Sequence, residues 1–178
     1  MTEFKLNTSL LKAWLDHRNG RRDKGPIIGE WDEDHWLCSL NGCAAHIIAK
    51  SQLHLDLSAW GEQAQFHCDS FHPGKSVQYP LEFTGQCLVA PDKTGKPRII
   101  RVYRFPDTSD APGRRVYLDA RYVAEFDDAG IVRMTGSSDL APVYFYTTAD
   151  DWAEPCGFAL PINPKTVEKP TKEGPSHA

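Results

Sequence analysis

Residues 116–135, VYLDARYVAEFDDAGIVRMT, carry the pattern on which the expected fold depends. An alternating strand comes first, and Asp119 then supplies a good helix N-cap, because its side chain can accept a free N–H of the first turn. Apolar residues follow at helical spacing, so we predict a helix over 119–127 that ends near Gly130. Residues 131–135 are predicted as the next strand, which gives the order strand, helix, strand.

The same order occurs near the N-terminus. Residues 4–6 alternate as a short strand, Asn7 or Thr8 can cap the helix predicted over 8–18, and Asn19-Gly20 favours its end. Three predicted strands follow each helix: 26–31, 35–40 and 43–49 after the first, and 131–135, 143–148 and 157–162 after the second. Two such units place two helices on one face of an antiparallel sheet, so the expected fold class is α+β.

A tight turn and a strand-rich middle complete the expected fold. Asn41-Gly42 predicts a type I′ hairpin. Residues 49–114 are either an insertion between the two units or an extension of the sheet. Their predicted strands are 53–60, 64–68, 79–89 and 98–105. Residues 1–163 are expected to form one domain, whereas residues 164–178 bury too little apolar surface to offset their ordering entropy and are expected to be disordered.

Composition limits the classes of function. The chain has 178 residues and a net charge of −4, which excludes a uniformly basic nucleic-acid binder but leaves room for a local basic patch. No apolar run is long enough to span a bilayer, and the first residues lack the apolar core of a signal peptide. The five cysteines are an odd number at irregular spacing, which argues against a disulfide framework. We therefore expect a cytoplasmic protein that does not bind membranes.

Basic residues gather at the end of the first predicted helix and in the loop after it. They are Lys12, Arg18, Arg21, Arg22 and Lys24. One interpretation is a patch that contacts DNA phosphates. The other is a solvated helix end whose cations complement the helix dipole. Arg121, on the second helix, faces away from the apolar stripe and is a further candidate for DNA contact.

The sequence contains no recognisable catalytic or metal-binding motif. A nucleophile elbow, a P-loop and a His-Glu-x-x-His motif are all absent, so we expect no enzyme activity and no cofactor. The cysteines and histidines lack matched zinc-ligand pairs, so we expect buried free cysteines, surface histidines and no metal. The residues weighed for this site are Cys38, Cys43, His46, His54, His67, Cys68 and His72. The aromatic residues Tyr144, Phe145, Tyr146 and Trp152 are interpreted as core on one face and edge cover on the other.

Four segments together resemble a known family. They are LDARYVAEF at 118–126, IVRM at 131–134, PVYF at 142–145 and GFALPI at 157–162, and they resemble the closing half of the last domain of a bacterial DNA polymerase sliding clamp (β subunit). The first half is similar too, with a Leu-Leu helix, then Pro26-Ile27-Ile28 entering a strand, then residues 36–40. The resemblance covers roughly residues 4–48 and 115–163.

The resemblance implies a fold and a function. The family's processivity-fold domain has two helices that line a DNA-encircling ring, with sheets outside. Leu160, Pro161 and Ile162 match the C-terminal part of the family's partner-peptide pocket, which implies partner binding there. Bacterial clamps carry three such domains per chain, whereas this chain has room for one, with an enlarged strand-rich middle.

These observations lead to three hypotheses. The first is a non-enzymatic, phage- or plasmid-type accessory or clamp-like protein of DNA replication that binds DNA, replication proteins or itself as an oligomer. The alternative is a protein-protein interaction module with no nucleic-acid role that docks through the strands of 49–105. A third is a hydrolase or metal-dependent enzyme whose site has no sequence signature.

Overall fold

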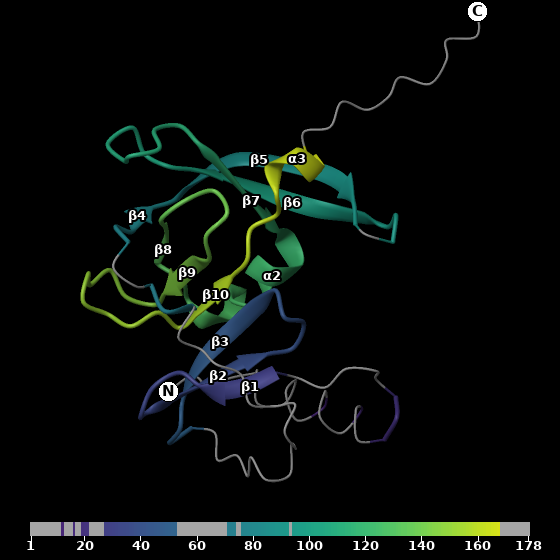
Figure 1. Ribbon diagram of the computed structural model, residues 1–178, viewed down its shortest axis with the longest axis vertical. Coiled ribbons are helices and arrows are strands. Elements are labelled where there is room, and N and C mark those ends of the chain that lie inside the picture. Colours follow the sequence, from purple (N-terminus) through teal and green to yellow (C-terminus); the bar gives the residue numbers. More distant parts are fainter. Residues whose placement is uncertain are drawn as a thin grey trace, which may run out of the picture.

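The computed structural model describes residues 12, 16, 19–21, 27–52, 71–73, 76–92 and 94–167. These residues form two antiparallel sheets with short helical segments beside them (Figure 1). The coarse prediction of an antiparallel sheet protein with short helices is therefore confirmed. No helix among these residues has the length and apolar character needed to cross a membrane.

The larger sheet joins the two predicted repeat units. Its seven strands are β1 Ile27–Glu30, β2 His35–Ser39, β3 Ala44–Ala49, β4 Tyr79–Pro80, β8 Arg133–Gly136, β9 Val143–Tyr146 and β10 Gly157–Ala159. Their order across the sheet is β1-β2-β3-β10-β9-β8-β4. The last strands of the two units, β3 and β10, pair with each other, with Ala159 opposite Ala44 and Gly157 opposite His46. Each unit thus contributes three consecutive strands to one continuous sheet, and the two sets meet at this β3–β10 seam.

The smaller sheet is built mainly from the middle of the chain. It contains β5 Glu82–Pro91, β6 Pro97–Arg104 and β7 Arg115–Asp119, in that order. The sequence left open whether the middle is an insertion or an extension of the sheet, and the structure shows both. Strand β4 extends the larger sheet beside β8, whereas β5 and β6 form a second sheet with β7. The strands predicted over 53–60 and 64–68 lie outside the described residues.

The second predicted helix is present but shorter than expected. Asp119 caps α2 (Ala120–Ala124) by accepting the N–H of Arg121, as predicted. The Phe126 N–H then bonds to the Val123 carbonyl, three residues back, so the chain tightens into the 3₁₀ turn η4 (Asp127–Ala129) before Gly130 ends it with φ of 70°. Of the first helix, only Lys12 and Asp16 are described, and both are helical. The prediction that the two helices pack side by side therefore lies outside the described residues.

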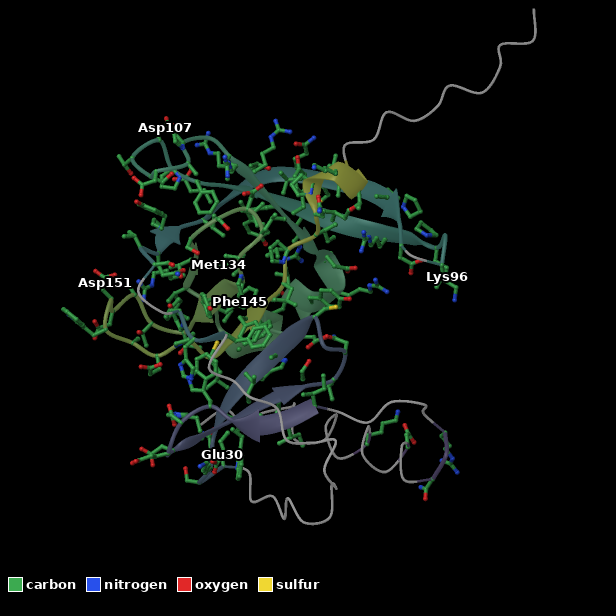
Figure 2. All side chains as sticks on the ribbon, viewed as in Figure 1. Glu30, Lys96, Asp107, Met134, Phe145 and Asp151 are labelled. Atoms are coloured by element: carbon green, nitrogen blue, oxygen red, sulfur yellow. The ribbon has the colours of Figure 1, made fainter. Side chains whose placement is uncertain are left out.

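The main core lies between the two sheets and includes the inner side of α2. It contains Leu81, Tyr103, Phe105, Val116, Leu118, Val123, Phe126, Val143, Phe145 and the small residues Ala44 and Ala159. The Phe126 ring stacks on Phe145 with 4.3 Å between centroids and on His46 with 4.2 Å. Phe145 lies near the centre of the molecule (Figure 2). This stack fixes α2 over the seam of the larger sheet.

The hairpin between β2 and β3 differs from its prediction. A type I′ turn needs positive φ at both central residues, but no non-glycine residue in the described part has positive φ, and only Gly42 does so here, at 75°. The Asn41 side chain instead accepts the N–H groups of Cys43 and Ala44, both at 2.8 Å. Asn41 therefore stabilises the turn through its side chain, without taking the positive φ that a type I′ turn needs.

The C-terminal boundary also differs. Strand β10 ends at Ala159, three residues before the predicted 162, and residues 164–167, predicted to be disordered, form the helical turn α3 (Pro164–Val167). Asn163 caps this turn by accepting the N–H of Lys165 at 3.0 Å. Val167 packs with Ile162 on the outer face of the smaller sheet, so enough apolar surface is buried to order these residues.

Candidate functional site

Two members of the basic cluster are described, and both project into solvent. Lys12 and Arg21 are exposed, and within the described residues neither side chain has a carboxylate partner. The other members, Arg18, Arg22 and Lys24, lie outside the described residues. The described structure thus shows both cations at the surface, without a carboxylate partner among the described residues.

The backbone at the end of the first helix holds Arg21 in place. Gly20 has φ of 69°, and the Arg21 N–H donates to the Asp16 carbonyl at 2.7 Å. A bond that spans five residues after a left-handed glycine is the Schellman ending of a helix. The predicted helix end at Asn19-Gly20 is confirmed, and Arg21 begins the loop at a defined position.

Arg121 has a different environment from the rest of the predicted DNA contacts. Its Nε and Nη2 donate to the two carboxylate oxygens of Asp119 at 3.0 and 2.7 Å. Burial of Asp119 alone would raise its pKa, but the hydrogen bonds from the Arg121 side chain and backbone outweigh burial and lower it. The same carboxylate raises the pKa of Arg121. Although Arg121 is exposed, its charge is already neutralised by a carboxylate that belongs to the fold.

Most other described arginines are also paired. Arg104 bonds Glu82, Arg114 bonds Asp139 and Arg133 bonds Asp151, at 2.9 to 3.0 Å, and Arg101 lies 3.8 Å from Asp127. Lys12 and Arg21 differ from this majority. Arg115, on β7, is a further exposed arginine for which no ion pair is present in the described structure, and it provides a comparison for experiments.

The predicted partner-binding residues serve the fold. The Leu160 N–H donates to the Cys43 carbonyl and the Ile162 N–H to the Tyr117 carbonyl, at 2.7 and 2.8 Å. Leu160 packs on the face of the larger sheet that carries Tyr144 and Phe158, opposite the main core. Ile162 is buried on the outer face of the smaller sheet. The segment 160–162 therefore links the two sheets, and only Leu160 and Pro161 remain partly exposed.

The residues weighed for a metal site do not come together where they are described. No group of three or more potential ligands gathers in the part of the chain that the structure describes. His54, His67 and Cys68 lie outside it. His72 instead stacks on Trp31, with 3.7 Å between centroids, and its Nε2 bonds the Trp31 carbonyl at 2.9 Å.

His46 takes part in a polar contact that the sequence did not indicate. It was interpreted as a surface histidine, but its side chain is only 3% exposed, and its Nε2 lies 3.1 Å from Oε2 of Glu125. The other carboxylate oxygen of Glu125 accepts the Asn41 amide at 2.8 Å. The position of His46 inside a strand of otherwise apolar residues was the sequence signal that its side chain is buried. The contact ties the β2–β3 hairpin to the end of α2.

Trp152 also departs from its prediction. Phe145 is core, as expected, but Tyr144 and Tyr146 are also buried on the other face of the interior strand β9 and do not cover an edge. Trp152 lies in the loop 147–156 and is 93% exposed. The acidic residues and proline around it were the available signal, because these residue types favour a loop over a strand. Trp152 is therefore neither core nor edge cover.

Comparison with known proteins gives no further assignment: no family model, no curated protein and no solved structure matches this chain.

Proposed function

We propose that this chain is a non-enzymatic, clamp-like accessory protein of DNA replication that binds duplex DNA through the basic cluster of its first helix and loop. The observation that supports the proposal is the β3–β10 seam, where two three-strand units meet in one sheet. A repeated strand–helix–three-strand unit is what the resemblance to sliding clamps implies.

The charges of the described residues support the location of the DNA contact. Lys12 and Arg21 are exposed and lack ion pairs in the described structure, whereas Arg121 is neutralised by Asp119. Lysine and arginine at such positions neutralise phosphates without reading bases. In this proposal the DNA contact involves Lys12, Arg18, Arg21, Arg22 and Lys24, and Arg121 positions α2.

The salt dependence of DNA binding tests this proposal. Each phosphate contact contributes a log–log slope of about −0.9 on duplex DNA, so five contacts give a slope of about −4 to −5. Changing Arg21 and Arg22 to Ala should make that slope about 2 less steep and should weaken binding to DNA of any sequence by the same factor. The measurement is fluorescence anisotropy with a labelled duplex over a range of salt concentrations.

Arg115→Ala is the matched control, because it removes an exposed arginine elsewhere that has no ion pair in the described structure. It should leave the slope unchanged. Absence of DNA binding by the wild type at physiological salt contradicts the proposal and favours the solvated helix end. Equal effects of both variants contradict the assigned location.

A second candidate function is the interaction module without a nucleic-acid role. The observation that favours it is the exposure of large apolar side chains on β5 and β6: Phe83 is 51%, Val89 73% and Ile99 55% exposed. These residues fall within the strands of 49–105 that were expected to dock a partner.

A further inference from the structure

The loop between β9 and β10, residues 147–156, presents a tryptophan to solvent in an acidic setting. Trp152 is 93% exposed and is the most exposed of the large hydrophobic residues in the described structure. The loop sequence, TTADDWAEPC, contains three acidic residues and no basic one. Tryptophan is enriched among the residues that dominate binding energy at protein interfaces. The exposed Trp152 is therefore a candidate contact point for a partner.

Hydrogen bonds anchor residues 150–152 of this loop. Arg133 donates to Oδ1 of Asp151 at 2.9 Å and to the carbonyl of Asp150 at 2.7 Å, while its guanidinium lies 4.2 Å from the centre of the Tyr146 ring. The Asp150 side chain accepts the Trp152 N–H at 3.1 Å. Because the backbone around Trp152 is already ordered, a partner that binds it meets little additional cost in conformational entropy.

A second exposed apolar surface lies on the β5–β6 hairpin, residues 82–104. Val89 and Ile99 are opposite each other in the register and share a face with Tyr103. At Tyr103 this face packs into the main core, but farther toward the hairpin tip it is open to solvent. Arg101, one third exposed, lies on the same face beside Ile99. The hairpin thus combines an apolar strip with a neighbouring arginine that lies 3.8 Å from Asp127.

The two surfaces have opposite charge. Residues 82–104 contain five basic and two acidic residues. Glu82 is paired with Arg104 and Arg101 lies 3.8 Å from Asp127, so the sequence leaves Lys93, Lys96 and Arg98 against Asp92. The loop 147–156 has three acidic residues, of which only Asp151 bonds a described arginine through its side chain. Opposite charges around apolar contacts favour association and fix its orientation.

The two surfaces cannot meet within one molecule. Figure 2 shows Asp151, in the loop, and Lys96, at the hairpin tip, on opposite sides of the molecule. We propose that a second copy of this chain is the partner: the Trp152 loop of one copy docks on the Val89–Ile99 strip of the next. Two different surfaces make a head-to-tail contact, so each associated pair leaves one loop and one hairpin free for further copies.

This inference rests on the interaction-module candidate, in which the hairpin docks a protein, and does not depend on DNA binding. The negative charge of the loop disfavours a nucleic acid or an anionic membrane as the partner of Trp152, because both are negatively charged. The charge of the hairpin, in the same chain, is what makes a second copy the fitting occupant.

Sedimentation velocity over a range of protein concentrations tests the proposal. The wild type should self-associate, and high salt should weaken the association because screening reduces the charge attraction. Trp152→Ala should weaken it at least tenfold, as expected for a central tryptophan. Val89→Thr with Ile99→Thr should have a similar effect while keeping β-branched side chains in the strands. Val132→Thr removes another exposed apolar side chain, 62% exposed, and should have no effect.

Mixing the two variants gives the decisive result. The Trp152→Ala chain keeps its hairpin, and the Val89→Thr/Ile99→Thr chain keeps its loop, so the mixture should form one-to-one pairs and nothing larger. Arg21→Ala/Arg22→Ala should associate like the wild type, which separates this contact from DNA binding. A monomeric wild type, unchanged association of Trp152→Ala, or two variants that do not pair overturns the proposal. If the wild type is monomeric, the partner of the Trp152 loop is a different protein and not a second copy of this chain.

Discussion

Gly157 occupies a position on β10 where the ring of Phe126 crosses the seam. A methyl group there would lie 2.5 Å from the Ala45 carbonyl oxygen and 2.7 Å from Cζ of Phe126. The ring cannot move aside because it is stacked between His46 and Phe145. The absence of a side chain at residue 157 is therefore what allows α2 to approach the sheet.

Gly157→Ala is expected to destabilise the fold by overpacking, at a cost of about 1–3 kcal/mol. The measurement is the free energy of unfolding in urea. Gly136→Ala is the control, because a methyl group at that position meets Leu81 at 3.4 Å and Phe105 at 3.6 Å, which are ordinary contacts. The two variants should differ clearly, and equal stabilities would contradict the packing derived for Phe126.

Residue-scale contacts divide into those that sequence can indicate and those that it cannot. The Asp119 cap was predicted because its partner, the Arg121 N–H, is two residues away. The His46–Glu125 contact joins residues separated by 79 positions, and no local pattern ranks that pair above others. The ion pair between Arg121 and Asp119 is also local. The sequence places Arg121 on the polar side of the helix, but it does not show which carboxylate the guanidinium contacts.

At the scale of the element, α2 is a short helix that depends on one carboxylate. Asp119 is fully buried, caps the helix and pairs with the Arg121 guanidinium. Asp119→Asn should keep the cap, because asparagine caps as well as aspartate, but lose the ion pair, at a cost of about 1–2 kcal/mol at pH 7. Asp119→Ala should lose both and cost about 1 kcal/mol more.

The same variants have a defined pH dependence. The pKa of Asp119 is lowered in the folded state, so its contribution to stability is complete above the unfolded pKa of about 3.9 and is lost as the pH falls through the folded value. The stability difference between the wild type and Asp119→Asn should therefore shrink in acid. Urea unfolding at neutral and acidic pH measures it, and a constant difference would show that the carboxylate charge is not what stabilises α2.

Elements were predictable where local pattern determines them. Six of the strands in the larger sheet and the hairpin β5–β6 match predicted segments, because alternation and flanking turn residues are local signals. The Asn41-Gly42 turn type was wrong because the Asn41 side chain bonds two backbone N–H groups, an option that the dipeptide alone does not reveal. Residues 164–167 were missed because their order comes from tertiary packing of Val167.

At the scale of the molecule, the question is whether the two repeat units fold as one body. The β3–β10 pairing makes their strands a continuous sheet, and the main core takes Ala44 from the first unit and Val143, Phe145 and Ala159 from the second. The smaller sheet adds Tyr103 and Leu118 to the same core. Neither unit buries its inner face without the other, so the structure favours a single cooperative transition.

Equilibrium unfolding with two core variants tests this cooperativity. Ile28 on β1 and Val143 on β9 are both fully buried, one in each unit. Ile28→Ala should cost about 2–5 kcal/mol and Val143→Ala somewhat less, by loss of buried methyl groups and the cavity left behind. If the units unfold together, each variant should shift the circular dichroism and tryptophan fluorescence transitions equally, with an unchanged slope against urea. The contradicting outcome is two separated transitions, of which Ile28→Ala shifts only one. The seam would then join two units that unfold independently. In that case the continuous sheet would not support a clamp-like domain.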